Sequence, residues 1–209
     1  MFEPRDEWSC KTHLAGAVLG ALATVYLIVV NIHESTGRLI AMTVFGISII
    51  ALYSCSAIYH YSKGIPSHIE KLRKLDHSMI FVLISGTYTP IMYICLPEKT
   101  GIIFLTVLWI FAAAGVVMKI LWLYAPRWLY TLIYLVMGWS IIFDFHAFIS
   151  LPNKFIAILL AGGIAYTIGA VMYAMKKPNP SEKFGFHEIF HVFIIIGTTL
   201  HFIGIAFMI

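Results

Sequence analysis

Seven long apolar runs dominate this chain of 209 residues, and they limit its possible folds more than any single motif does. A helix that crosses a membrane needs roughly 20 mostly apolar residues, and in lipid only helices or closed barrels satisfy every backbone hydrogen bond. Continuous runs of this length indicate helices. The predicted spans cover residues 13–32, 39–61, 75–96, 102–123, 128–149, 155–175 and 187–209.

The composition supports a membrane protein of the all-α class. Hydrophobic residues make up 60% of the chain and charged residues 11%, whereas soluble domains carry about 25% charged residues. Short breaks such as Gly64-Ile65-Pro66 and Pro178-Asn179-Pro180 separate the runs and stop helices. The sequence therefore predicts one integral membrane domain over residues 1–209, a bundle of seven transmembrane helices. We expect no secretory signal peptide, because the first run is a full span without a cleavage site.

The positions of Lys and Arg predict the orientation of this bundle. Eleven of them fall on the side of the N-terminus, and three, Arg38, Lys99 and Lys154, fall on the other side. The positive-inside rule then places the N-terminus in the cytoplasm and the C-terminus outside, in the cell membrane, which is the inner or plasma membrane. We interpret the net charge of +4 as a topology signal. It predicts membrane lipids as partners and no nucleic acid, and the sequence names no protein partner.

Several ionisable residues fall at one level of the predicted bundle. His187 and His191 in the string HEIFH lie about one helical turn apart, so both imidazoles face the same way. His60 and Asp76 lie near the same cytoplasmic ends of their spans. Ionisable groups inside a membrane indicate function, and zinc prefers imidazole ligands. We therefore expect a Zn²⁺ ion held by His60, His187 and His191, with an open position for water.

Two further residues complete the predicted site. Asp76 is placed to accept a hydrogen bond from that water, and Ser56 precedes His60 by one turn on the same helical face. These two are the candidate catalytic residues. The simpler interpretations are that His187 and His191 are merely packed against each other and that Asp76 only favours a helix N-terminus through the helix dipole.

Four sequence segments resemble a known family. They are SCSAIYH, which contains Ser56 and His60, LDHSMIFVLISGTYTP over 75–90, MGW over 137–139, and HEIFHVFIIIGTTLHF over 187–202. In this order they are similar to the hemolysin III branch of the progestin and adipoQ receptor (PAQR) family. The resemblance implies seven transmembrane helices, a cytoplasmic N-terminus and zinc near the inner leaflet, held by His60, His187 and His191 beside Asp76 and Ser56. One position departs from the family, because Ser9 stands where its first motif has Asn.

Several functions remain open at this stage. A metal-dependent hydrolase of a lipid amide or ester would use zinc to activate water, and the resemblance implies ceramide-like cleavage or a role in membrane homeostasis. A sensor or receptor of the membrane state would use a closed, structural zinc site. HEIFH also matches the H-E-x-x-H string of metalloproteases, although His60 as the third ligand argues against a protease. Cytolysis, after which the hemolysin III branch is named, is a further alternative, for which no pore-forming segment is found.

The remaining polar residues have less specific interpretations. Glu188 is either a general base or an interfacial carboxylate, and we favour the second. His13 and His77 are nearby reserves for the inner site, and we favour an interfacial role for both. We interpret Asp144, His146 and His201 as remote from that site. Packing is the expected role of the three cysteines, Cys10, Cys55 and Cys95, whose spacing suggests neither a metal site nor a disulfide. Gly162, Gly163 and Gly169 are expected to allow close approach of helices.

Overall fold

The computed structural model describes residues 4–144 and 151–208, and its regular structure is entirely helical over these ranges. The α-helices are α1 (Glu7–Asn31), α2 (Thr36–Tyr61), α3 (Pro66–Cys95), α4 (Glu98–Leu121), α5 (Arg127–Gly138), α7 (Asn153–Met175) and α8 (Phe186–Phe207). A short 3₁₀ helix, η1 (Ser140–Asp144), follows α5. The predicted all-α class is confirmed.

Six of these helices are long and apolar enough to cross a membrane, namely α1, α2, α3, α4, α7 and α8. The helix α5 has only 12 residues, and the predicted fifth span, 128–149, extends into residues 145–150, which lie outside the described residues. The chain is therefore a multi-pass helical membrane protein. A seventh crossing stays a prediction.

Helix starts coincide with the prolines that the sequence offers. Pro66 occupies the first turn of α3, while Pro97, Pro126 and Pro152 immediately precede α4, α5 and α7. A proline is tolerated there because the first helical N–H groups have no partner within the helix. Each α-helix begins earlier than its apolar run predicts. The difference is largest for α3, which begins at Pro66, and for α1, which begins at Glu7, because polar residues continue these helices beyond the apolar part.

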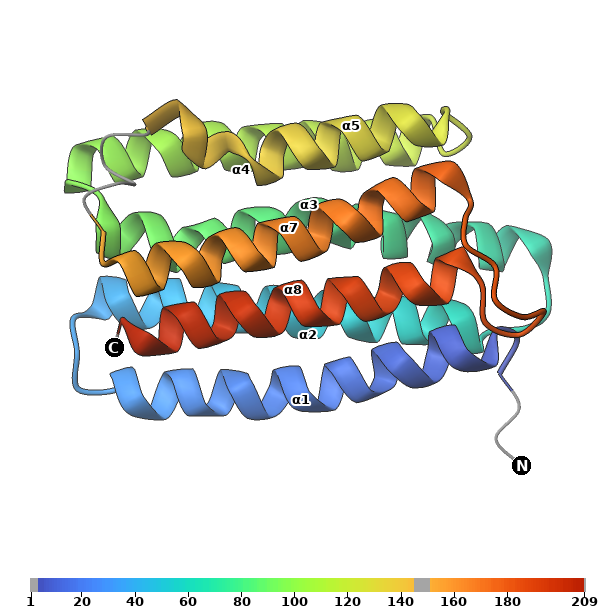
Figure 1. The fold of residues 1–209 in the computed structure, drawn as a ribbon, viewed down its shortest axis with the longest axis horizontal. Coiled ribbons are helices and arrows are strands. Elements are labelled where there is room, and N and C mark those ends of the chain that lie inside the picture. Colours follow the sequence, from blue (N-terminus) through green and yellow to red (C-terminus); the bar gives the residue numbers. More distant parts are fainter. Residues whose placement is uncertain (1–3, 145–150, 209) are drawn as a thin grey trace.

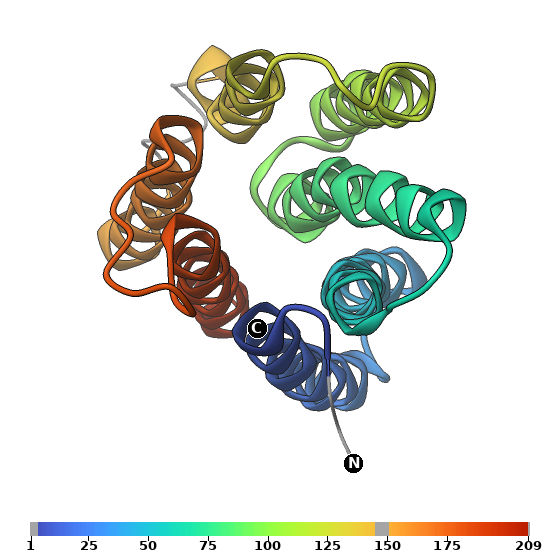
Figure 2. The same ribbon diagram turned by 90° about the vertical axis from the view of Figure 1, so that its right-hand side faces the viewer.

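The helices lie side by side along the length of the molecule, with the two termini at opposite ends (Figure 1). Seen from the end that carries the N-terminus, they form a ring (Figure 2). Neighbours in sequence pack together from α1 to α4 and again from α7 to α8, while α5 packs against α7 and α3. The helix α1 also packs against α8, so the first and last helices close the ring. This closure brings the start of α1 beside the start of α8 and the end of α2.

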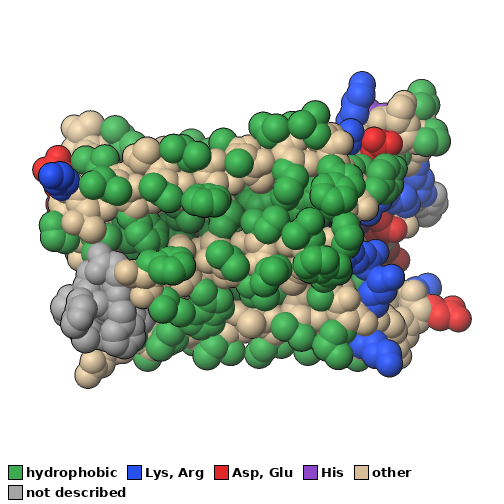
Figure 3. Space-filling view, turned by 90° about the horizontal axis from the view of Figure 1, so that it is seen from above, with side chains coloured by type: hydrophobic (Ala, Val, Ile, Leu, Met, Phe, Trp, Pro, Cys, Tyr) green, Lys and Arg blue, Asp and Glu red, His purple; other side chains and the backbone are tan. Residues whose placement is uncertain are grey.

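The surface separates into an apolar length and a basic end (Figure 3). Large hydrophobic side chains on the outer face of α1 are exposed, among them Val18, Leu22 and Val25 at 57%, 64% and 60%. Such a continuous apolar surface belongs in contact with lipid. Lys and Arg side chains gather at the end where α1 and α8 begin (Figure 3), which we call the basic end.

Candidate metal centre

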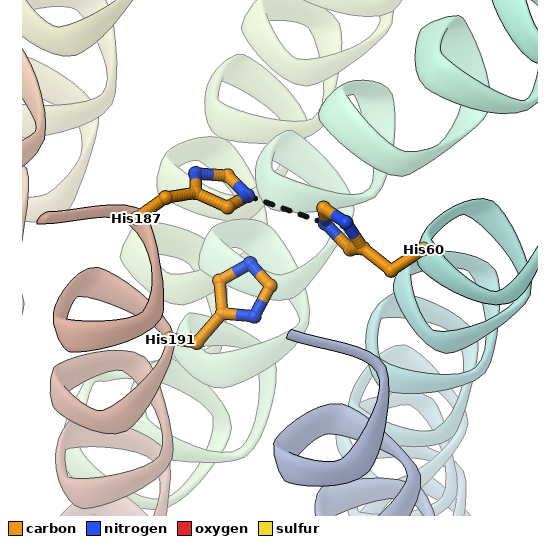
Figure 4. A group of neighbouring side chains, drawn as sticks. All are labelled: His60, His187 and His191. Carbon is orange, nitrogen blue, oxygen red and sulfur yellow. Dashed lines mark hydrogen bonds between the residues drawn. The ribbon is translucent and has the colours of Figure 1, made fainter. Parts of the chain in front are cut away.

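Three histidine rings meet where the end of α2 comes beside the start of α8. His60 lies in the last turn of α2, while His187 and His191 lie one turn apart in the first turns of α8. One ring nitrogen from each lies within 4.8 Å of the other two. Figure 4 shows the three rings turned toward one another. The structure thus brings together the three imidazoles that were predicted as ligands.

The spacing of these nitrogens suits a metal ion. Nε2 of His60 lies 3.2 Å from Nε2 of His187, and two nitrogen ligands at about 2.0–2.1 Å from a tetrahedral zinc lie about 3.3 Å apart. His60 and His191 are each only 2% exposed, and buried polar nitrogens are unfavourable unless they have partners. Both nitrogens of His60 have partners, Asp6 and Nε2 of His187 (dashed line in Figure 4), whereas Nδ1 of His191 has none. A cation that accepted a lone pair from each ring would replace the contact between His60 and His187 and would give His191 a partner. The donor set, three imidazoles, fits zinc and several other transition metals.

Asp6, which precedes α1, fixes the orientation of the His60 ring. Its Oδ2 accepts a hydrogen bond from Nδ1 of His60 at 2.9 Å, and its backbone N–H donates to the His60 carbonyl at 3.0 Å. Burial raises the pKa of Asp6, but hydrogen bonds from His60 and Arg5 outweigh burial and hold that pKa at about 2. The carboxylate is therefore ionised at neutral pH and keeps the proton of His60 on Nδ1. The lone pair of Nε2 is left for a metal.

Sequence reasoning did not single out Asp6. In the sequence Asp6 is only an acidic residue that precedes the first span, and acidic residues are common at helix N-termini. Only the packing of α1 against α2 shows that Asp6 contacts a histidine from another helix.

The two predicted catalytic residues lie close to the cluster without joining it. Asp76 on α3 is 8% exposed, and its Oδ2 is 3.8 Å from Nε2 of His77. Ser56 on α2 is 1% exposed, interacts with the Asp76 carboxylate, and has no well-formed hydrogen bond from its Oγ. Both residues line the same cavity as His187 and His191. Asp76 does not belong to the group of three histidines whose ligand atoms lie within 4.8 Å of one another.

A fourth imidazole supports the cluster from α1. His13 is 3% exposed, and its ring stacks on His191 with centroids 3.6 Å apart and an interplanar angle of 11°. Neither of its ring nitrogens has a hydrogen-bond partner. The closure of α1 onto α8 therefore buries this ring against the cluster, so His13, a nearby reserve in the sequence, contacts one of the three predicted ligands.

Glu188 links two helices instead of facing the cluster. Its Oε2 accepts a hydrogen bond from the backbone N–H of Gly185 at 2.9 Å, which caps α8. Its Oε1 accepts another from Oγ of Ser9 on α1 at 2.6 Å. The residue that departs from the family pattern, Ser9, therefore helps to hold α1 against α8.

The more distant candidates are placed as follows. His201 lies further along α8, where its Nε2 is 3.2 Å from the Leu159 carbonyl oxygen. His146 lies outside the described residues, and η1 ends at Asp144. The three cysteines are free, and Cys10 is buried.

A cavity of about 170 Å³ extends from His187 and His191 along the inside of the ring to His201. These two ends of α8 are about 20 Å apart at 1.5 Å per residue, whereas one leaflet of a bilayer has a hydrocarbon thickness of about 15 Å. The walls between them are mainly apolar and include Leu83, Ile84, Ile91, Leu159, Leu160 and Ile194. The cavity has the length and lining that an acyl chain requires.

Fold and site together define a multi-pass helical membrane protein with a buried histidine cluster at its basic end. A family model described as "Haemolysin-III related" matches residues 4–202. Hemolysin-3 of Bacillus cereus is 34% identical over 202 residues, which cover 94% of this chain and 88% of that protein. The Hemolysin-3 homolog of Bacillus subtilis (strain 168) is 34% identical over 210 residues, 99% of this chain and 96% of that protein. The chain belongs to the haemolysin III family, as the resemblance predicted.

Proposed function

We propose that this protein is a zinc-dependent hydrolase that cleaves an amide or ester bond of a membrane lipid, with His60, His187 and His191 as the zinc ligands. The observation that carries the proposal is the meeting of three imidazoles at one end of an apolar cavity of acyl-chain length. Zinc held by three protein ligands acts as a Lewis acid and lowers the pKa of water to about 7. The three histidines supply such a site.

The remaining steps belong to side chains of this chain. Asp76 would take the proton of the attacking water while the water oxygen bonds to the carbonyl carbon. It would then give that proton to the leaving nitrogen or oxygen as the C–N or C–O bond breaks. General acid–base catalysis of this kind contributes about 10²- to 10⁴-fold. Ser56 is placed to orient the Asp76 carboxylate, with which its side chain interacts.

The proposal includes an orientation in the membrane. The basic end, where the cluster lies, would face the cytoplasm, and the C-terminus would lie outside after seven crossings. Substrate would reach the cluster from the inner leaflet of the cell membrane.

Two alternatives are less well supported by the geometry. A purely structural zinc site closes with four protein ligands, whereas the group found among the described residues has three. In an H-E-x-x-H protease the glutamate acts as general base, but both oxygens of Glu188 accept hydrogen bonds from Gly185 and Ser9. The relatives are named for hemolysis; in this account lysis would follow indirectly from altered lipid composition.

The test compares zinc content and lipid cleavage in one set of purified variants. We expect His187→Ala to lose both zinc and hydrolysis of fluorescent ceramide and ester lipids. Asp76→Ala is expected to keep its zinc and to lose hydrolysis by at least about 100-fold. The exposed His68 serves as the matched control, since His68→Ala removes an imidazole outside the cluster. Unchanged zinc in His187→Ala, or full activity in Asp76→Ala, would contradict the proposal.

A further inference from the structure

Lys119 is a buried cation that the proposed chemistry does not use. It lies in the last turn of α4 and is only 4% exposed. Its Nζ lies 3.4 Å from the centroid of the Tyr130 ring, and among the described residues no hydrogen bond or ion pair of this ammonium group is found. A buried ammonium without a paired carboxylate is unfavourable in a folded protein. The carboxylate that attracts Lys119 is Asp76, which lies beyond ion-pair distance and also attracts Arg73, so among the described residues Lys119 is left without an anionic partner in direct contact.

Membrane topology alone does not account for this burial. A lysine near the end of a span ordinarily extends its side chain to the water interface. Lys74, at the same end of the bundle, does so and forms an ion pair with Glu70 at 3.2 Å, with 28% of its side chain exposed. Lys119 instead points into protein, against Tyr130, and it lines the internal cavity.

Positive charge exceeds negative charge at this end of the cavity. Arg73 on α3 and Arg127 at the start of α5 line it together with Lys119, and Asp76 is the one carboxylate among the lining residues. The Arg127 guanidinium lies over the Tyr173 ring at 5.2 Å and the Phe186 ring at 5.5 Å. Lys119 and Arg73 repel each other electrostatically, and both are attracted to the single carboxylate of Asp76, which cannot neutralise the two of them. Two neighbouring cations in a low-dielectric pocket attract an anion more strongly than they would in water.

The apolar part of the same cavity begins directly beside these charges. Ile80 and Leu83 follow Arg73 and Asp76 along α3 toward the middle of the bundle, and all of them line the cavity. A ligand that fills the cavity therefore meets cations at one end and hydrocarbon along the rest.

We propose that Lys119 and Arg73 form an anion subsite that binds the phosphate or carboxylate head of an acidic lipid, whose acyl chain occupies the apolar part of the cavity. The subsite deepens the proposed function, because it names an acidic lipid as the substrate class. Only the cleavage of the bound lipid rests on the proposed hydrolase; the binding itself does not. Arg and Lys both make charge-assisted hydrogen bonds to such oxygens.

The test measures binding to the whole protein in phosphatidylcholine nanodiscs. The probes are phosphatidic acid, a fatty acid and the neutral diacylglycerol, each with the same fluorescent acyl chain, and inorganic phosphate is the competitor. We expect the wild type to bind one of the acidic probes at least about tenfold more tightly than diacylglycerol. Lys119→Met and Arg73→Gln should each weaken that binding about tenfold and leave diacylglycerol binding unchanged. Lys74→Gln, which removes a charge from the exposed face, should change it less than twofold.

The outcomes separate this inference from the zinc hydrolase. Equal binding of neutral and acidic probes, or unchanged binding in both Lys119→Met and Arg73→Gln, would overturn the subsite. Displacement of the acidic lipid by inorganic phosphate at equal concentration would show that the site takes a free anion and not a lipid. Zinc content is measured on the same samples. If no zinc is found, the hydrolase proposal fails, but the lipid-binding result still tests the subsite. Arg73 is only half-buried, so its variant gives a result even if Lys119→Met folds poorly.

Discussion

The carboxylate of Asp6 holds Nδ1 of His60 at 2.9 Å, so a residue in front of the first helix fixes a ring on the second. Carboxylates in this position orient a metal-binding histidine, and their loss typically costs about 10- to 100-fold in metal affinity. We expect Asp6→Asn to weaken zinc binding by this factor, measured by competition with a chelator. Glu7→Gln changes a neighbouring carboxylate that pairs with Lys11 on the surface and should leave the affinity unchanged; equal affinities for the two variants would remove the assigned role of Asp6.

Substitution by alanine should affect stability differently at two glycines of α7, Gly163 and Gly169. A Cβ at Gly169 would lie 2.7 Å from Cβ of Phe193, whereas a Cβ at Gly163 would lie 3.7 Å from the Trp139 ring. Overpacking costs about 1–3 kcal/mol, so Gly169→Ala should lower the free energy of unfolding by that amount in mild detergent. Gly163→Ala should be neutral or gain up to about 1 kcal/mol from helix propensity. The opposite order would show that α7 and α8 do not pack as described.

Thr198 joins three helices next to the cavity. Its Oγ1 accepts a hydrogen bond from the Tyr53 hydroxyl at 2.8 Å and lies 2.8 Å from the Tyr166 hydroxyl. Thr198→Val leaves these buried hydroxyls without their partner, which should cost about 1–3 kcal/mol of unfolding free energy. Thr43→Val is the control, because the Thr43 hydroxyl bonds only to a carbonyl of its own helix and should cost less than about 0.5 kcal/mol. Similar losses in both variants would argue against the network.

The seven-span topology can be tested with single cysteines in an otherwise cysteine-free chain. If the basic end faces the cytoplasm, Lys99→Cys and Lys154→Cys should react with a membrane-impermeant maleimide on intact cells. Lys183→Cys should react only after permeabilisation. Lys154 reports on the short helix α5, because it lies outside only if the chain crosses the membrane between α4 and α7. Protection of Lys154→Cys together with labelling of Lys99→Cys would mean that this segment does not cross.

The apolar runs predict the helices well because every span in lipid must be a helix of about 20 mostly apolar residues. They predict helix ends less well: α3 begins at Pro66 and not at residue 75, since a helix continues into polar sequence where water and headgroups replace lipid. The fifth span is the weakest, because its α-helix ends at Gly138 and a 3₁₀ turn follows.

The site likewise contains residues that the sequence identifies and residues that only the packing of the helices reveals. His187 and His191 could be paired from the sequence because their spacing places them on one helical face, and His60 followed from its predicted depth. Asp6 and Lys119 could not be assigned to the site, and His13 could be named only as a nearby reserve, because the roles of all three depend on which helices are neighbours. Hydropathy gives the length and depth of a span but does not say that α1 closes onto α8 or that Lys119 turns inward.

The central claim is that three imidazoles bind a single zinc ion. X-ray absorption at the zinc edge of the purified wild type measures the ligands directly. We predict one zinc per chain with three imidazole nitrogens at about 2.0–2.1 Å and an oxygen in the remaining position. A protein that is purified without bound zinc and takes up none on addition, or a shell containing sulfur at about 2.3 Å, would contradict the account.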